Sequence, residues 1–148
     1  MTYDNLKFES ILENDLIEII RNAMTAQNVY PDITINRAGV FMDADKFPKI
    51  TVKADPVNED FANIYTGDMS VFCDTYMQDD KTGSELDDLV AAVRFAFIDP
   101  ESDLNDRLNA ASSFLTYFAA VPGEGFSDPE THVRRYTLQL QVKFSPRK

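Results

Sequence analysis

The chain offers one thiol and one imidazole for nucleophilic chemistry. Cys73 is the only cysteine and His132 is the only histidine. A nucleophilic mechanism needs a base hydrogen-bonded to the nucleophile. Cys73 lies in an alternating segment with the apolar Val71 two residues before it, whereas His132 lies in a polar stretch. These settings predict a buried cysteine and a surface histidine, and we expect no nucleophilic catalysis.

Glycine-rich motifs that bind phosphate are absent from the sequence. No G-x-S-x-G, Walker-type or G-x-G-x-x-G sequence occurs. The run GEG at residues 123–125 lacks the third glycine and the following helix of a dinucleotide-binding loop. We therefore predict a turn there and expect no cofactor.

Carboxylates are the most numerous candidates for chemistry, with 25 acidic residues in the chain. Residues 99–110 resemble the start of a calcium loop, but Leu104 replaces its glycine and Ala110 its bidentate glutamate. Three acidic clusters remain as candidate magnesium ligands: Asp43 with Asp45, Asp79 with Asp80, and Asp87 with Asp88. A two-metal site or a glycosidase pair needs carboxylates from separate elements. Solvated turns and helix faces are the favoured interpretation, and we expect no metal.

Helical periodicity marks two elements that would position these groups. Apolar residues recur every three to four positions over residues 10–26, where Ser10 and Glu13 have the form of a capping box. The same period predicts a helix from Ser84 to Phe97, with Ser84 and Asp87 as its capping pair. A short third helix is predicted after Asp99, with Pro100 in its first turn.

Alternating patterns predict five strands, over residues 33–40, 50–54, 67–77, 114–121 and 136–144. Residues 56–66 are interpreted as a long loop or an extended arm, and residues 122–130 as a loop. Two helices and a short one are too few for a crossover at each strand. The order therefore predicts one α+β domain over residues 1–148, a mostly antiparallel sheet with the helices packed on one face.

The net charge of −11 is unevenly distributed. Residues 41–106 hold sixteen acidic and five basic side chains, whereas residues 107–148 hold three acidic and six basic ones. Such a balance is not typical of a nucleic-acid binder, which needs clustered Lys and Arg. Apolar runs are too short for a membrane span, and the first residues are too acidic for a signal peptide. We expect a soluble intracellular protein.

Candidate interface residues lie in both charged regions. Phe61, Ile64 and Tyr65 interrupt the polar connection, and they either anchor against another subunit or fold back on their own sheet. Arg134 and Arg135 belong to the basic end, which either meets the acidic middle of a neighbouring copy or is simply solvated. Complementary halves in one chain suit head-to-tail association, which closes into a ring if the rotation allows.

The whole chain, over about residues 10–145, resembles one family in its order of elements. The resemblance is carried by the helix ending in an aromatic-Pro turn (15–31), FPKITV (47–52), GDMSVFCDTY (67–76), SELDDLVAAVR (84–94) and RYTLQLQVKF (135–144). These segments resemble the tail-terminator and tail-completion proteins of tailed bacteriophages and their head-to-tail joining relatives. The family's fold is a small sheet with helices on one side.

The resemblance implies a structural virion protein without enzymatic activity. Such a protein forms a ring, commonly a hexamer, at the head-proximal end of the tail tube, where it ends polymerisation. Its partners would be the tail tube protein and a neck or connector protein, in the host cytoplasm during assembly and then in the virion. DNA would pass through without specific binding, past carboxylates from residues 41–106. Expected contact regions are residues 55–66 and 78–83, the latter including Asp79 and Asp80.

Two other classes of function stay open from the sequence. An acidic binding protein could mimic DNA and occupy a basic groove on a nuclease or repressor, provided that its carboxylates follow one surface at phosphate spacing. A carboxylate- or metal-dependent hydrolase, using Asp79 or Asp80, would lose its activity on chelation. The architecture and charge layout favour the ring protein.

Overall fold

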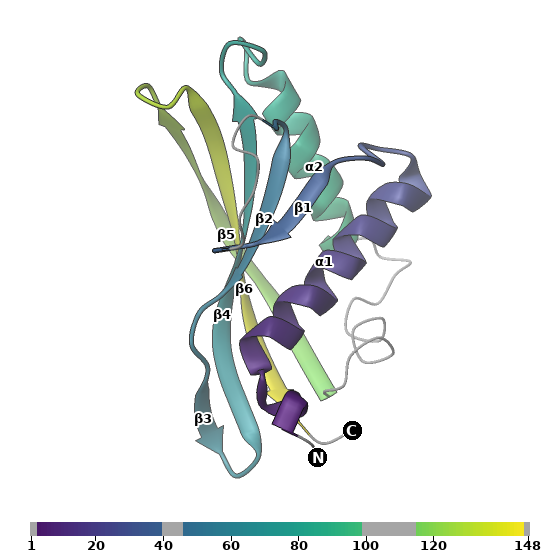
Figure 1. The fold of residues 1–148 in the computed structure, drawn as a ribbon, viewed down its shortest axis with the longest axis vertical. Helices are drawn as coiled ribbons and strands as arrows, with labels where there is room; N and C mark the ends of the chain where they lie inside the picture. The colour runs from purple at the N-terminus through teal and green to yellow at the C-terminus, as the bar shows by residue number, and fades with distance from the viewer. Residues whose placement is uncertain (1–2, 40–45, 99–114, 147–148) are drawn as a thin grey trace.

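The computed structural model describes residues 3–39, 46–98 and 115–146 of the chain. Within them, a six-stranded sheet carries two helices on one face (Figure 1). The elements are a short 3-10 helix (Tyr3–Leu6), α1 (Phe8–Gln27), β1 (Thr34–Arg37), β2 (Lys49–Ala54), β3 (Asn58–Phe61), β4 (Ile64–Tyr76), α2 (Ser84–Ile98), β5 (Leu115–Asp128) and β6 (Val133–Ser145). The predicted α+β class is confirmed.

The strands follow the order β1-β2-β4-β6-β5, and β3 pairs with the first residues of β4. Only the β1–β2 pair is parallel; the other described pairs are antiparallel, as predicted. β4 is the central strand, because it pairs with β2 and β3 on one side and with β6 along twelve registered positions on the other. Its 13 residues span roughly 40 Å at about 3.3 Å per residue.

Helix α1 forms because its apolar residues return every fourth position to the same face. Leu12, Leu16, Ile20 and Met24 are all buried against the sheet. The helix ends at Asn28, a left-handed residue whose backbone N–H donates to the carbonyls of the last turn. No side chain caps its N-terminus, so the predicted capping box of Ser10 and Glu13 is wrong.

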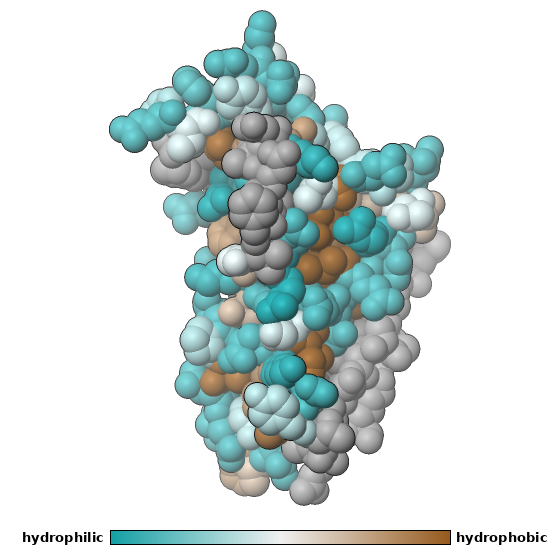
Figure 2. All heavy atoms as spheres, viewed as in Figure 1, coloured by the Kyte–Doolittle hydropathy of each residue, from teal (hydrophilic) through white to brown (hydrophobic). Residues whose placement is uncertain are grey.

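The hydrophobic core lies between the helices and the inner face of the sheet. On β6, Leu138, Leu140, Val142 and Phe144 alternate with exposed polar residues, which confirms the predicted last strand. The inner-facing residues of β2 and β4 and one side of α2 complete the same cluster. Figure 2 shows hydrophobic residues on the visible surface mainly along the strip where α1 meets the sheet. None of the helices in the described part of the chain is long and apolar enough to span a membrane.

Strands run through the segment interpreted as a long loop or an extended arm and through the segment interpreted as a loop. Residues 58–66 form a β3–β4 hairpin, so β4 begins at Ile64 and not at residue 67. β5 continues through the Gly- and Pro-containing run to Asp128, with a bulge between Val121 and Glu124. The turn predicted at residues 123–125 is therefore wrong, because pairing along the whole of β6 outweighs the local turn composition. The short helix predicted after residue 99 lies outside the described residues.

Candidate interaction surface

The β3–β4 hairpin forms an arm, defined here as residues 58–66, that extends beyond β2 at the lower end of Figure 1. All four residues of β3 are exposed, and a left-handed Asn63 closes the turn. Phe61 has 72 % of its surface exposed, with Glu59 and Asp60 beside it on the strand. The interpretation of this segment as an extended arm is confirmed, since an exposed two-stranded element projects there.

The three apolar candidates of the arm have different positions. Tyr65 packs on its own core, with its ring centroid 4.8 Å from that of Phe8 and 5.5 Å from that of Phe144. Ile64 is half-buried, and Phe61 is exposed. The sequence left open whether these residues anchor against another subunit or fold back on their own sheet, and Tyr65 folds back on its own sheet. Phe61 is the residue of this group that remains available to another molecule.

The base of the arm is closely packed. A side chain on Gly67 would bring its Cβ to 2.9 Å from Val57 Cγ1, so the backbone of β4 passes directly against the β2–β3 connection. The backbone N–H of Asp55 donates to the carbonyl of Asp68 at 2.9 Å. These contacts hold the connection and β4 together at the point where the arm leaves the sheet.

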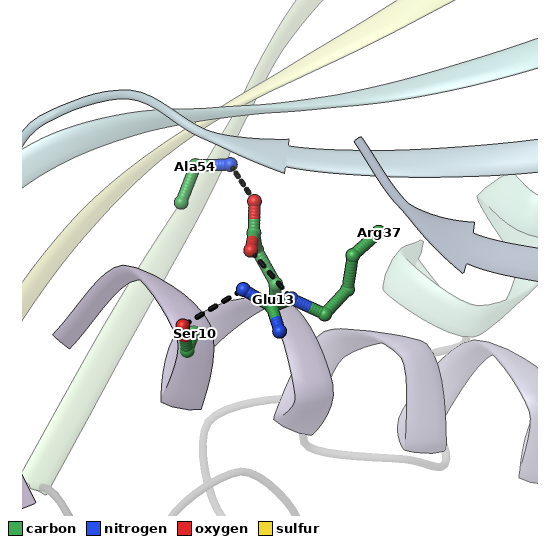
Figure 3. Close-up of polar contacts among 4 residues, drawn as sticks. All are labelled: Ser10, Glu13, Arg37 and Ala54. Carbon is green, nitrogen blue, oxygen red and sulfur yellow. Dashed lines mark hydrogen bonds and ion pairs between the residues drawn. The ribbon is translucent and has the colours of Figure 1, made fainter. Parts of the chain in front are cut away.

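A buried carboxylate on α1 fixes the same connection (Figure 3). Glu13 accepts hydrogen bonds from Arg37 Nε at 2.9 Å and from the backbone N–H of Ala54 at 2.8 Å. Arg37 also donates to Ser10 Oγ at 2.7 Å, and its partner Glu13 is only 7 % exposed at the side chain. One helical turn earlier, Glu9 accepts from the N–H of Val57 at 3.2 Å.

Sequence reasoning missed this polar clamp, defined by Ser10, Glu13, Arg37 and the Ala54 amide. It assigned Ser10 and Glu13 to the start of their own helix, whereas both reach across to β1 and β2. The signal was the position of Glu13 within the apolar stripe, next to Leu12, where a charge needs a partner. Neither periodicity nor spacing names that partner, because it lies 24 residues away.

Asp80 is part of the fold and not of the accessible surface. Its side chain accepts from Thr75 Oγ1 at 2.8 Å and from the amides of Glu85 and Leu86 at 3.0 and 3.1 Å. It therefore caps α2, the role predicted for Ser84, and only its neighbour Asp79 is exposed. Arg134 donates to the carbonyls of Asp80 and Lys81 across this turn. The predicted contact pair Asp79 and Asp80 is thus divided, and Arg134 is bound within its own chain.

Burial of Asp80 disfavours its charge, but its hydrogen bonds from Thr75, Glu85 and Leu86 and the nearby Arg134 outweigh burial and hold its pKa below the ordinary value of 3.8. The ionised carboxylate therefore stabilises the fold above pH 3.8, and this contribution is lost as pH falls through the lower pKa of the folded protein. We expect Asp80→Asn to lower the free energy of unfolding by about 1–3 kcal/mol at neutral pH. In urea unfolding, the difference in free energy of unfolding between Asp80→Asn and the original protein should become smaller at acidic pH.

The control for this substitution is Asp79→Asn, which removes the same charge from the exposed neighbour. It should change the free energy of unfolding by less than about 0.5 kcal/mol at either pH. If the two variants changed the free energy of unfolding equally, Asp80 would affect stability only through the net charge of the protein.

Arg135 is also bound within its own chain. Its guanidinium donates to both carboxylate oxygens of Asp74, from Nε at 2.7 Å and from Nη2 at 3.0 Å. The same guanidinium lies 4.6 Å from the ring centroid of Phe72. These hydrogen bonds raise the pKa of Arg135, although burial opposes the rise. Both arginines proposed for a neighbouring copy therefore already have partners.

The described residues of the sheet face opposite the helices are mostly polar, with Phe72 as an aromatic residue among them. Its central rows place Thr51, Phe72 and Thr137 side by side, followed by Lys53, Ser70 and Gln139. Two of the described carboxylates of residues 41–106 lie on this face, because Asp68 and Asp74 alternate along β4 with residues that face the core; Asp68 is exposed, and Asp74 is buried and bound by Arg135. Glu59 and Asp60 lie on the arm, whereas Asp79 and Glu85 lie at the other end of β4 (Figure 1).

The candidate nucleophile and the candidate metal ligands are placed apart. Cys73 is fully buried, and this burial, with a smaller effect of Asp74, raises the pKa of its thiol to about 12. His132 is exposed, which confirms its predicted surface position. Among the described residues, no group of three or more His, Cys, Asp or Glu side chains could hold a metal ion.

Comparison with known proteins adds no assignment to this geometry. No protein-family model matches the chain. No curated protein matches it significantly either. The arm, its anchoring and the surfaces described above are the features of the molecule that bear on its function.

Proposed function

We propose that the chain is a structural virion protein that assembles into a ring, with about six copies, at the head-proximal end of a bacteriophage tail tube. The ring would end polymerisation of the tube and join the tail to the neck. Its partners would be the tail tube protein and a neck or connector protein, and DNA would pass through it without specific binding.

The arm is the observation that carries this proposal. It presents Phe61 to solvent on a hairpin whose base is held by the polar clamp, by Glu9 and by the stacking of Tyr65 on Phe144. Aromatic residues are enriched among the side chains that anchor protein interfaces, so an exposed phenyl ring on a closely held projection suits contact with a neighbour. The fold, an antiparallel sheet with helices on one face, also agrees with the fold that the family resemblance implies.

The acidic alternatives receive less support from the described residues. A DNA mimic needs a continuous row of exposed carboxylates, but within β4 Asp68 is exposed whereas Asp74 is buried and bound by Arg135. For the same reason the described residues lend no support to the expected acidic lining of a DNA channel. The hydrolase hypothesis depended on Asp79 and Asp80, and Asp80 is occupied as the cap of α2.

Light scattering after size-exclusion chromatography tests the proposal directly. We expect a mass that is a multiple of the 16.8 kDa chain, either at high protein concentration or after addition of tail tubes. Electron microscopy should then show a ring capping one end of each tube. A protein that stays monomeric at every concentration and leaves tube ends uncapped would overturn the proposal.

A further inference from the structure

The tip of the arm combines an aromatic ring with negative charge. Among the phenylalanines whose burial the structure describes, Phe61 is the most exposed. Glu59 and Asp60 precede it on β3. No basic side chain of the arm balances these two carboxylates. A receiving surface for this tip therefore needs an apolar recess with positive charge at its rim.

Two apolar recesses lie away from the arm. One, of about 560 Å³, lies between α1 and α2 and includes Met24 and Phe95; the only charged residue among those that line it is Asp88. The other, called here the terminal groove, has about 540 Å³ and is lined by residues 30–34 and 46–48. It lies beside the first residue of β2, at the end of the sheet opposite the arm (Figure 1).

Charge distinguishes the two recesses. An acidic tip would be repelled by Asp88 and by the C-terminal end of α1, which carries the negative end of the helix dipole. The terminal groove has Lys46 at its rim, and the Nζ of Lys49 lies 4.8 Å from the ring centroid of Phe47 inside it. Both lysines lie on the side of the groove formed by residues 46–48, which is therefore its positively charged side. The other side holds Asp32 and Tyr30, whose pKa is raised by burial and then by the carboxylates of Glu85, Asp88 and Asp80.

We propose that the arm tip of one copy docks into the terminal groove of a second copy. Phe61 would lie on Phe47 and its apolar neighbours, and Glu59 and Asp60 would face Lys46 and Lys49. This inference rests on the self-association in the proposed function and names the surfaces that carry it. Because the arm and the groove lie at opposite ends of β4, the contact is head-to-tail, and repeated contacts close a ring or extend a filament.

Charge reversal with rescue is the decisive experiment. We expect the pair Glu59→Lys and Asp60→Lys, and separately the pair Lys46→Glu and Lys49→Glu, each to raise the concentration needed for assembly by at least about tenfold. All four changes in one chain restore opposite charges across every contact, so assembly should return toward that of the original protein. A defect in folding would not be rescued in this way. Failure of the fourfold variant to recover would overturn the charge pairing.

Phe61→Ala tests the apolar half of the contact by the same measurement. We expect it to raise the assembly concentration at least about tenfold, because an exposed tip residue matters only to the interface. The matched control is Phe95→Ala, which removes a partly exposed ring from the recess between the helices and should leave assembly unchanged. If Phe95→Ala disrupts assembly and Phe61→Ala does not, the terminal groove is not the docking site.

The failure of this inference is distinguishable from failure of the proposed function. If the original protein forms rings on tail tubes and all these variants assemble equally well, the arm-groove contact is wrong and the ring protein stands. If the original protein remains monomeric with and without tubes, both are overturned.

Discussion

Arg135→Met is expected to lower the free energy of unfolding by about 3–5 kcal/mol. The reason is the position of its partner. Asp74 has no exposed side-chain surface, and two of its hydrogen bonds come from this guanidinium, at 2.7 and 3.0 Å. Methionine keeps much of the contact area with Phe72 but leaves a buried carboxylate without its counter-charge. Denaturant unfolding followed by circular dichroism measures the loss.

Substitution of the partner carboxylate, Asp74, should lower the free energy of unfolding by less. The Arg135 side chain is 42 % exposed, so in Asp74→Asn the guanidinium can turn to water, and we expect a loss of about 1–2 kcal/mol. The double variant should then be more stable than Arg135→Met alone, because the stranded charge is gone. Lys143→Met, on an exposed position of the same strand, is the matched control and should be nearly neutral. Additive losses in the double variant would contradict a direct pairing of Arg135 with Asp74.

The spacing of apolar residues correctly predicted the last strand and the first helix of the core. β6 and α1 each bury one face, so their side chains repeat with the period of the element, and both were predicted within a few residues. The strand β3 within the arm and the second half of β5 were not predicted from this periodicity. β3 buries no residue and has no period to detect, and β5 contains turn-forming residues that pairing with β6 holds extended.

The candidate site was harder to predict because its groups are paired over long distances in the sequence. Asp80 looked like a surface carboxylate, but Thr75 and the start of α2 enclose it. Arg134 and Arg135 looked like an exposed basic end, yet their partners lie 54 and 61 residues earlier in the chain. Composition identifies the charges that a chain carries, and only the fold determines which of them remain free for another molecule.

Glu13→Ala is expected to lower the free energy of unfolding by about 2–4 kcal/mol and to loosen the arm as well. The substitution removes the acceptor of the Ala54 amide at 2.8 Å and the counter-charge of Arg37 at 2.9 Å. Because Ala54 is the last residue of β2 and leads into the arm, we expect its loss of anchoring to reach residues 58–66. Hydrogen exchange should show faster exchange of the arm amides, with little change on β6.

Glu18→Ala, on an exposed position of the same helix, removes one carboxylate without touching β2 and is the matched control. Its effect should stay below about 0.5 kcal/mol, with unchanged exchange in the arm. If Glu13→Ala weakened assembly only as far as it weakened the fold, the clamp would serve stability alone. If the arm exchanged faster and assembly fell further than the stability loss explains, the buried carboxylate on α1 would be keeping Phe61 positioned for a neighbouring molecule. That second result is the one we expect, since an arm ordered before binding loses less conformational entropy when it docks.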